Sequence, residues 1–341
     1  MSTSGVSVVV PTLGRPELAR LLTALAEGLP EAAGPVEVVL VDDRRRASPP
    51  LPVPDRLVPV TTVVQGRAAG PAAARNLGWR AARYSWVVFL DDDVVPEPDW
   101  FARLADDLAM DPPVGGVQGQ VTVPLPHRRP TDWERSTAGL ATGRWITADM
   151  AYRRSVLAAV GGFDERFPRA YREDVELAYR VQQAGWRLVS GQRRVVHPVR
   201  PESRWVSLRT QRGNADDALL RRLYGRGWRS RLGLPIGRRP AHLAATGAAA
   251  LAVAGGLAVR RGGARLRSVA RGLTLVGVVG WLVVTGEFAT ARIRPGPRTP
   301  AEVVVMLATS VAIPPVATWH WLLGWWRARG ARPWPAPREQ R

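Results

Sequence analysis

The sequence contains neither cysteine nor lysine. Without cysteine it can form no disulfide bond, no thiolate metal site and no cysteine nucleophile, so any metal must be held by oxygen or imidazole ligands. All 48 basic residues are arginine. Together with the abundance of alanine, glycine and proline, this is typical of the codon bias of a GC-rich genome rather than of a particular function.

Acidic residues are scarce in the last third of the chain. Residues 1–225 hold 30 arginines and 26 acidic residues, whereas residues 226–341 hold 18 arginines and three acidic residues. A basic segment of this kind can bind nucleic acid or an anionic membrane surface. Because these arginines separate long apolar stretches instead of alternating with exposed aromatic residues, the pattern favours a membrane surface and predicts no nucleic-acid partner.

A basic segment is also missing before the first apolar run, so no cleavable signal peptide is expected and the first domain is expected in the cytoplasm. At 341 residues and 46% hydrophobic content, the chain can fill a sizeable core. We predict two domains: a catalytic domain at residues 1–225 and a helical, membrane-associated region at residues 226–341.

The first part of the chain alternates short apolar runs with helix-like segments. Continuous apolar strands joined by helices indicate an α/β fold with a Rossmann-like, mainly parallel sheet that is flanked by helices on both faces. The expected strands are 6–10, 36–41, 57–64, 86–90, 115–123, 146–152, 186–190 and 194–197, and the expected helices are 17–27, 71–83, 99–110, 154–160 and 173–184. Residues 124–143 are expected to form a loop near the active face.

Polar residues follow three of the expected strands at once. In parallel sheets, ligands bind beyond the carboxyl ends of the strands. The residues at these ends are Thr12 and Arg15, Asp42 and Asp43, and Asp91, Asp92 and Asp93.

Three consecutive carboxylates repel one another and raise each other's pKa values, unless a cation is present. Mg²⁺ or Mn²⁺ prefers such oxygen ligands and often binds one or two carboxylates together with substrate phosphates. The alternative is a solvated acidic turn that caps the helix expected near Asp99.

Six short segments follow one another in a specific order. They are Val6–Thr12 (VSVVVPT), Val39–Asp43 (VLVDD), Ala74–Gly78 (ARNLG), Phe89–Asp93 (FLDDD), Gly161–Glu165 (GGFDE) and Arg172–Asp174 (RED). In order and spacing they resemble the family 2 glycosyltransferases of GT-A fold, and the whole chain resembles a membrane-associated bacterial member. The resemblance spans roughly residues 6–200.

The resemblance implies a nucleotide site at the strand ends. Pro11, Thr12 and Arg15 would form the first nucleotide-binding loop, and Asp42 and Asp43 would recognise the base or ribose. Arg75 would approach the nucleotide, although its helical position also allows a simple ion pair with Asp43. Two further contacts to the nucleotide sugar are expected from Asp91 and Asp92, of which Asp92 is the less specific.

The same resemblance implies a metal site for Mg²⁺ or Mn²⁺. Asp93 is the primary metal ligand expected, and Asp91 contacts the ribose or the metal. His197 stands where some relatives place a histidine that contacts metal or diphosphate. A single histidine beside a proline is, however, more often structural.

Asp174 is the expected general base. An inverting transfer needs a carboxylate that takes the proton of the acceptor hydroxyl, opposite the leaving diphosphate. The alternative is that Glu173 and Asp174 simply stabilise a helix N-terminus, where acidic residues are favoured.

Three features bear on substrate choice. Trp133, Arg144 and Trp145 lie where an acceptor loop is expected, although tryptophan is equally common in packing. Arg44, Arg45 and Arg46 replace the usual small turn residues, and Asp149 stands where relatives often have asparagine. These departures leave donor and acceptor selectivity open.

The basic region contains apolar runs at residues 241–259, 272–286 and 303–326. Only the third comfortably exceeds the ~20 residues of a membrane span, and the second, with 15 residues, is shorter than a span. Both flanks of the first run are basic, which conflicts with a simple spanning hairpin under the positive-inside rule. An interfacial or re-entrant arrangement, with Trp319, Trp321, Trp325 and Trp326 as anchors, avoids this conflict. Membrane association is expected, and both spanning and lying on the surface stay open.

The expected function is a metal-dependent glycosyltransferase at the cytoplasmic face of the cell membrane. It would move a sugar from a nucleoside-diphosphate sugar to a lipid-linked or cell-envelope glycan acceptor. Two alternatives stand beside it: a nucleotidyltransferase, for which a glycine-rich, lysine-containing triphosphate loop is missing, and a non-catalytic membrane scaffold that retains the fold.

Overall fold

The computed structural model describes residues 5–261 and 263–333, so the ends of the two expected domains at 1–4 and 334–341 lie outside the described residues. Internal contacts divide the described chain into two compact units. The first, here called the sheet unit, comprises residues 5–124 and 137–200. The second, the helical unit, comprises residues 125–136 and 201–333 without 262. Each unit is described by itself.

The sheet unit is built on an eight-stranded sheet of order β3-β2-β1-β4-β7-β6-β8-β5. The first four strands along the chain are parallel to one another, as expected. They are β1 (Val6–Thr12), β2 (Val36–Asp42), β3 (Thr61–Gln65) and β4 (Trp86–Leu90).

The later strands make the sheet mixed. They are β5 (Val95–Pro96), β6 (Val114–Thr122), β7 (Asp149–Arg153) and β8 (Arg187–Val196). β7 runs antiparallel to its neighbours β4 and β6, and β5 runs antiparallel to β8, while β6 and β8 are parallel. The expected α/β, Rossmann-like architecture is confirmed.

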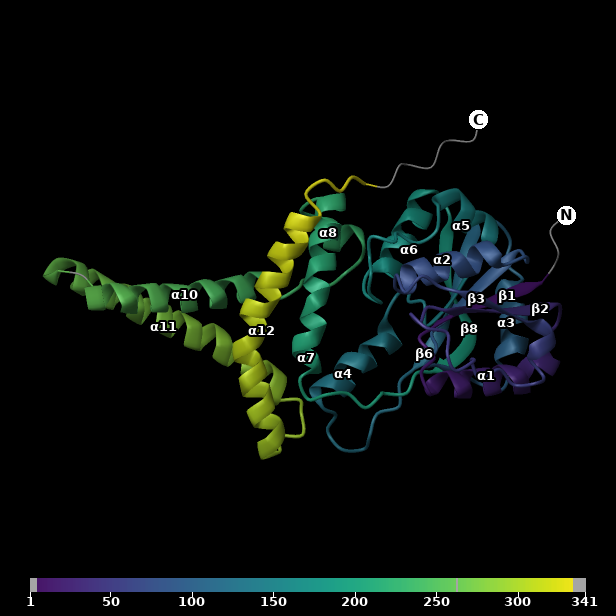
Figure 1. Ribbon diagram of the computed structural model, residues 1–341, viewed down its shortest axis with the longest axis horizontal. Coiled ribbons are helices and arrows are strands. Elements are labelled where there is room, and N and C mark those ends of the chain that lie inside the picture. Colours follow the sequence, from purple (N-terminus) through teal and green to yellow (C-terminus); the bar gives the residue numbers. More distant parts are fainter. Residues whose placement is uncertain (1–4, 262, 334–341) are drawn as a thin grey trace. The chain divides into compact units, whose positions relative to one another are not determined.

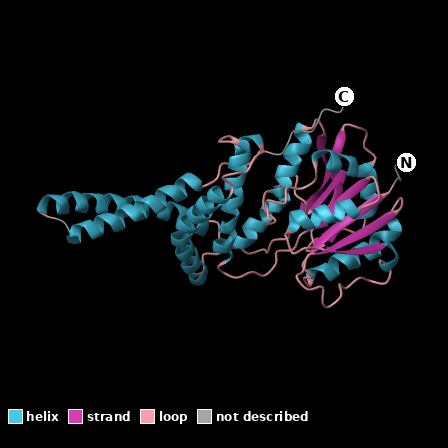
Figure 2. Ribbon diagram, turned by 45° about the horizontal axis from the view of Figure 1, so that its top comes forward, coloured by secondary structure: helices cyan, strands magenta, loops and turns pink. Residues whose placement is uncertain are grey.

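Helices cover both faces of this sheet, as Figures 1 and 2 show. Alternate residues of a strand point to opposite faces, so Val8 and Val9 enter different cores. Val8 packs with α1 (Glu17–Gly28) and α3 (Trp100–Leu108). Val9 packs with α2 (Pro71–Ala81), α5 (Arg154–Val160) and α6 (Glu173–Gln183). The continuous valine runs reflect this burial on both faces.

Several expected boundaries differ from the structure. The run 57–64 begins with the 3-10 turn η2 (Val58–Val60), because Pro59 has no N–H to give to a ladder, and pairing starts at Thr61. The two late strands are one strand, β8, whose pairing with β6 shifts register between Gln118 and Gln120. The expected loop 124–143 contains α4 (Asp132–Ala138) and η3 (Gly139–Thr142). The short turn η1 (Leu29–Glu31) follows α1.

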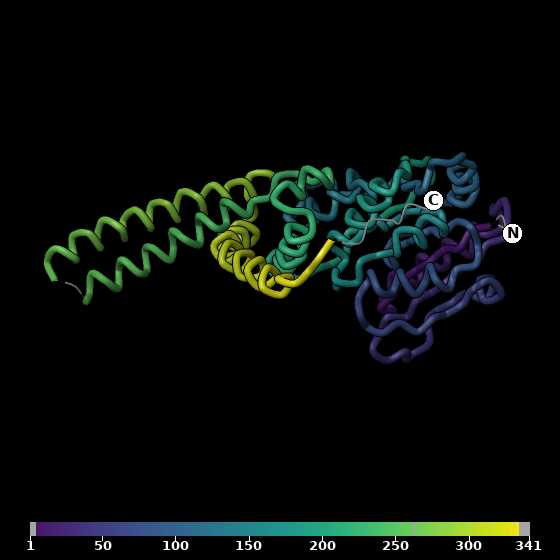
Figure 3. The backbone as a smooth tube through the Cα atoms, turned by 90° about the horizontal axis from the view of Figure 1, so that it is seen from above, coloured from purple at the N-terminus to yellow at the C-terminus, as the bar shows by residue number. Residues whose placement is uncertain are grey.

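The helical unit ends in three long helices: α10 (Arg239–Arg261), α11 (Ala264–Ile293) and α12 (Pro300–Arg327). α10 and α11 run side by side as a hairpin, which Figure 3 shows from above, and α12 packs against α8. The shorter helices that precede them are α7 (Val206–Arg209), η4 (Thr210–Gly213), α8 (Asn214–Tyr224) and α9 (Trp228–Arg231).

All three long helices are long and apolar enough to cross a membrane, by length and composition. The apolar run 272–286 has 15 residues, but it is part of a longer helix that meets this criterion. The helix that contains this run has 30 residues, because helical structure continues past Arg271 and Glu287, which bound the run.

Candidate active site

The carboxyl ends of three adjacent strands bring the expected site residues together. β1 lies between β2 and β4, and Thr12 at the end of β1 pairs with Asp42 at the end of β2. Asp91 follows directly after β4 on the other side of β1. The three polar groups that the sequence placed after these strands thus share one edge of the sheet.

Asp92 is bound by the first loop. Its Oδ2 accepts hydrogen bonds from Thr12 Oγ1 at 2.7 Å and from the Leu13 N–H at 3.3 Å, and its Oδ1 accepts one from Arg15 at 3.1 Å. The side chain is 4% exposed. Both of its oxygens therefore hold the loop after β1 in place, which makes Asp92 a support for this loop.

Both carboxylate oxygens of Asp42 are bound by the neighbouring Arg44. Arg44 donates from Nε and Nη2 to the two carboxylate oxygens at 2.8 and 2.7 Å. These hydrogen bonds outweigh burial and lower the pKa of Asp42, which stays ionised. Arg44 also lies against Gly14, where a Cβ would come within 2.8 Å of Arg44 Cδ. Arg45 and Arg46 are exposed.

Asp43 holds the loop that leads into α2. Its Oδ2 accepts a hydrogen bond from the Gly70 N–H at 2.9 Å. Its Oδ1 is buried and has no hydrogen-bond partner among the described residues. Gly70 has a φ of +94°, and a Cβ there would meet the Pro168 carbonyl oxygen at 2.4 Å, so glycine is required at this point.

Arg75 on α2 links the strand end to the start of α6. Its Nη2 donates to Asp91 Oδ1 at 2.7 Å and its Nη1 donates to Glu173 Oε1 at 2.8 Å. These are the ion pairs that the structure shows, in place of the alternative pairing with Asp43. Burial alone would lower the pKa of Arg75, but the charges of Asp91 and Glu173 prevail and raise it, so the guanidinium keeps its charge.

Asp93 faces a histidine and an arginine from the end of the sheet unit. Its Oδ1 lies 3.4 Å from His197 Nε2 and its Oδ2 lies 3.1 Å from Arg200 Nε. Burial raises the pKa of Asp93, and Asp91 adds to this, while His197 and Arg200 act in the opposite direction. His197 Nδ1 lies 3.2 Å from the Pro198 carbonyl. Because a carbonyl only accepts, Nδ1 carries the proton there and Nε2 is left to face Asp93.

The Asp93 and His197 pair suits a divalent cation. An ion about 2.1 Å from each of two ligand atoms requires a separation of roughly 3 to 3.5 Å between them, and the observed 3.4 Å meets this. Among the described residues, however, no group of three or more histidine and acidic side chains could hold a metal ion by itself. A cation here would need further oxygen ligands, such as substrate phosphates, which is the usual situation for Mg²⁺.

Asp174 lies in the first turn of α6, next to the buried Glu173. Its Oδ1 accepts a hydrogen bond from the Val175 N–H at 2.7 Å. Desolvation raises the pKa of Asp174, with Arg75 and Arg172 opposing it. Burial, followed by the charge of Asp174, raises the pKa of Glu173 to about 8. Adjacent carboxyl groups with raised pKa values are suited to proton transfer.

The backbone before Asp174 has an uncommon conformation. Arg172 adopts a φ of +79°, and its side chain stacks on Tyr171 with 4.4 Å between the guanidinium carbon and the ring centroid. Left-handed backbone at residues other than glycine is concentrated at functional sites. Trp145, in the expected acceptor loop, has a φ of +61° as well. Trp145 belongs to the sheet unit and Trp133 to the helical unit.

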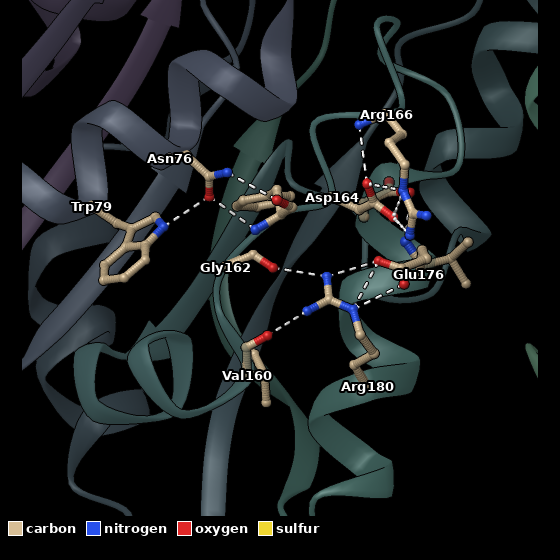
Figure 4. A network of polar contacts seen from close by, with 11 residues as sticks. Asn76, Trp79, Val160, Gly162, Asp164, Arg166, Glu176 and Arg180 are labelled. Carbon is tan, nitrogen blue, oxygen red and sulfur yellow. Dashed lines mark hydrogen bonds and ion pairs between the residues drawn. The ribbon is translucent and has the colours of Figure 1, made fainter. Parts of the chain in front are cut away.

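A polar network that sequence reasoning missed joins two of the six motifs, as Figure 4 shows. Asn76 donates to the Phe163 carbonyl at 2.8 Å and accepts from the Phe163 N–H and from Trp79 Nε1, both at 2.9 Å. Gly162, with a φ of +74°, has no room for a Cβ, which would meet Asn76 Oδ1 at 2.4 Å. The network places α2, and thus Arg75, against the segment that leads to α6.

Asp149 was noted as a departure near the site, but the structure places it in the core. It is fully buried and accepts hydrogen bonds from Arg193 Nε and Trp100 Nε1, both at 2.8 Å. Its carboxylate is therefore satisfied by protein groups. Substrate selectivity is not expected to depend on this position directly.

Most of the residues of this site lie in a segment that matches a known family. Residues 7–175 match the model of the family described as Glycosyl transferase family 2. Over 201 residues the chain is 30% identical to the Pre-mycofactocin glycosyltransferase of Mycobacterium tuberculosis, a match that covers 54% of this chain and 40% of that protein. It is 24% identical to the Hyaluronan synthase of Pasteurella multocida over 224 residues, covering 53% and 23%. The chain spans less than half the length of these relatives.

Among solved structures, the chain is similar to a mannosyltransferase from Pyrobaculum calidifontis in complex with GDP-Man and Mn²⁺, at 18% identity and a TM-score of 0.47, over 95% of this chain and 86% of the other. The family match and the Rossmann-like sheet agree with the GT-A fold that the sequence resemblance implies.

Proposed function

Because the domain at residues 7–175 belongs to glycosyl transferase family 2, we propose that this chain transfers a sugar from a nucleoside-diphosphate sugar to a lipid-linked or cell-envelope glycan acceptor. The observation that carries the proposal is the meeting of two acidic centres at one edge of the sheet. Asp93 faces His197, and Asp91 is joined through Arg75 to Glu173, the neighbour of Asp174. One centre can bind a diphosphate through a cation, and the other can hold a proton.

The nucleotide would bind over the ends of β1 and β2. Pro11, Thr12 and Arg15 would surround it, held by Asp92, and Asp42 and Asp43 would meet its base or ribose. Arg44 occupies both oxygens of Asp42, so nucleotide binding at Asp42 requires Arg44 to release it.

Asp93 and His197 would hold a Mg²⁺ or Mn²⁺ ion, with Asp91 close to it. Bound there, the cation would neutralise charge on the leaving diphosphate. Arg200 lies on the other oxygen of Asp93 and adds positive charge to the same place. Positive charge at the diphosphate lowers the barrier to departure of the nucleotide.

Asp174 would take the proton of the acceptor hydroxyl. Its raised pKa brings it closer to neutral pH, where a general base works best. Glu173 would position Arg75 and Asp91 rather than react. A carboxylate that accepts a proton while the diphosphate leaves from the opposite side gives inversion at the sugar carbon.

The membrane would supply the acceptor. The domain at residues 1–225 would face the cytoplasm, and the basic region at residues 226–341 would hold it to the membrane through long apolar helices. A lipid-linked acceptor is already concentrated in that surface.

A donor screen tests the proposal. Nucleoside-diphosphate sugars are added one at a time, with and without Mn²⁺ or Mg²⁺, and thermal stabilisation and donor hydrolysis are measured. We expect one base and one sugar to stabilise the protein only when the metal is present. Stabilisation by a nucleoside triphosphate with release of pyrophosphate would instead support a nucleotidyltransferase, and no response to any donor would support a scaffold.

A further inference from the structure

The hairpin of α10 and α11 is apolar on all of its open sides. Residues 272–286 of α11 and 243–259 of α10 contain no charged side chain. The large apolar side chains of α11 that remain exposed include Leu275, Val276, Val279, Leu282 and Val283, each 50% exposed or more. A helix that lies in a membrane interface needs a polar face toward water, and these two helices have none along these residues.

The two helices touch each other through small residues. A Cβ on Gly277 would lie 2.5 Å from the Ala252 backbone nitrogen, and a Cβ on Gly255 would lie 3.0 Å from the Ala270 carbonyl oxygen. Small residues that bring two backbones this close are typical of helix pairs in lipid, where apolar bulk gives no advantage at the contact.

The charged residues that bound the hairpin are spaced to match a bilayer. Arg239 and Arg260 lie 21 residues apart on α10, and Arg271 and Arg292 lie 21 residues apart on α11. At 1.5 Å per residue, each interval is about 31 Å, close to the ~30 Å of a hydrocarbon core. Glu287 falls inside the second interval, but it pairs with Arg238 through two hydrogen bonds at 2.9 and 2.6 Å, at the base of the hairpin.

α12 has 28 residues, a length between those of α10 and α11, but its surroundings differ. Arg292 is 8% exposed and donates to Thr309 Oγ1 at 2.8 Å and Ser310 Oγ at 3.0 Å, near the middle of α12. Its other Nη donates to Asp132 at 2.8 Å. Asp132 belongs to the segment 125–136, which includes Arg128, Arg129 and Glu134. Arg292 of α11 thus links a charged segment to α12 at Thr309.

This attachment leaves no place for a bilayer along α12. The helix has 28 residues and is about 42 Å long, and Thr309 lies ~14 Å from its start. Every interval of ~30 Å within that length includes Thr309. Farther along, a Cβ on Gly324 would meet the Ala215 backbone at 2.4 Å, so α12 also packs against α8, which carries Asp216, Asp217, Arg221 and Arg222.

We propose that α10 and α11 form a transmembrane hairpin with its arginine-rich turn at the opposite headgroups, and that α12 stays outside the hydrocarbon core. The positive-inside rule then assigns the orientation. Seven arginines in 221–239 and three in 292–298 flank the base, against five in 260–271 at the turn. The base, with α12 and the chain that leads into α10, therefore lies on the cytoplasmic side. This inference does not depend on the proposed enzymatic activity.

Single-cysteine labelling tests this topology, because the natural chain has no cysteine to interfere. Ser268→Cys and Ala264→Cys report on the turn, Ala301→Cys and Arg329→Cys on the two ends of α12, and Ala47→Cys on the sheet unit. All five positions are exposed in the structure. Each variant is expressed in a bacterial host and treated with a membrane-impermeant maleimide, on intact spheroplasts and on the same cells after lysis.

We expect the turn positions to react in intact spheroplasts and the other three positions to react only after lysis. A turn that reacts only after lysis would overturn the transmembrane hairpin. Reaction of Ala301→Cys and Arg329→Cys from opposite sides would show that α12 spans, and would overturn the second part of the proposal. Two turn positions keep the test decisive if one variant fails to insert.

Discussion

Two buried arginines of the sheet unit, Arg193 and Arg75, each lie between two carboxylates. The two clusters differ in whether their buried polar atoms all have hydrogen-bond partners. Arg193 donates to Asp149 at 2.8 Å, to Asp107 at 2.9 Å and to the Val117 carbonyl at 2.7 Å. Arg75 pairs with Asp91 and Glu173, but within the described part of the chain its Nε and Glu173 Oε2 are buried without hydrogen-bond partners.

The difference separates a structural cluster from a functional one. The Arg193 cluster is closed, since its carboxylates are at most 3% exposed, whereas Asp91 in the Arg75 cluster is 30% exposed. Unsatisfied buried groups cost free energy, so a cluster that keeps them is often retained for binding or catalysis. We therefore expect substitutions in the Arg75 cluster to affect activity and substitutions in the Arg193 cluster to affect stability.

The largest effect is expected from Asp174→Asn. Removal of the proposed base should lower kcat by roughly 10²–10⁴-fold while the protein stays folded. Steady-state transfer kinetics and thermal unfolding measure the two properties. Asp106→Asn, an exposed substitution, should leave both unchanged. Normal turnover in Asp174→Asn would remove the assigned role.

The second-largest effect is expected from Asp93→Asn, which should weaken donor binding and leave proton transfer intact. An amide is a poorer ligand than a carboxylate for a hard cation, so higher metal concentrations should partly restore activity. Titration with Mn²⁺ at a constant donor concentration measures this. The exposed Asp111→Asn is the control, and a metal response identical to that of the unaltered protein would refute the ligand assignment.

Arg193→Met should act on stability and not on chemistry. It leaves Asp107 and Asp149 buried without their partner, which should cost about 3–5 kcal/mol of unfolding free energy. Denaturant unfolding measures the loss, with Arg187→Met, exposed on the same strand, as the control. A selective loss of activity with unchanged stability would erase the distinction between the two clusters.

Glu173→Gln should have a smaller effect, of about tenfold on kcat, or ~1.4 kcal/mol. Gln carries no charge, so it removes the Glu173 carboxylate that pairs with Arg75 above the Glu173 pKa of about 8, and kcat should fall chiefly at alkaline pH. Because the pKa of Glu173 rises from its ordinary value to about 8 on folding, the native protein loses stability as pH rises through that interval. The variant should lose that dependence, which thermal unfolding across pH measures.

The smallest effect is expected from Arg44→Ala. Release of Asp42 removes two hydrogen bonds that the nucleotide must displace, so the donor Kd should change by less than about tenfold, toward tighter binding. Isothermal titration measures it, with the exposed Arg45→Ala as the control. Clearly weaker binding would mean that Arg44 contacts the donor directly.

The sequence predicted the sheet and the edge at which the site lies, because both depend on local patterns. Apolar strands of five to seven residues located β1, β2 and β4, and polar residues after each of them located Asp42 and Asp91. The six motifs in order matched the family over residues 7–175.

The partners of the site residues could not be predicted, because they depend on long-range packing. Nothing near Arg75 in the sequence indicates that it pairs with Glu173, 98 residues away. Asp149 resembled a site residue until Arg193 and Trp100 accounted for both of its oxygens. The extent of α11 could not be predicted from its 15-residue apolar run, because Arg271 and Glu287 bound that run without ending the helix.

The central claim is that the two acidic centres have separate tasks: Asp93 holds the donor through a metal, and Asp174 takes the proton. Calorimetric titration of the matching nucleoside-diphosphate sugar into Asp93→Asn and Asp174→Asn, with and without Mn²⁺, tests this most directly. The account predicts that Asp174→Asn binds the donor as tightly as the unaltered protein and only with metal, while Asp93→Asn loses that metal-dependent binding. Equal loss of donor binding in both variants, or none in either, would contradict it.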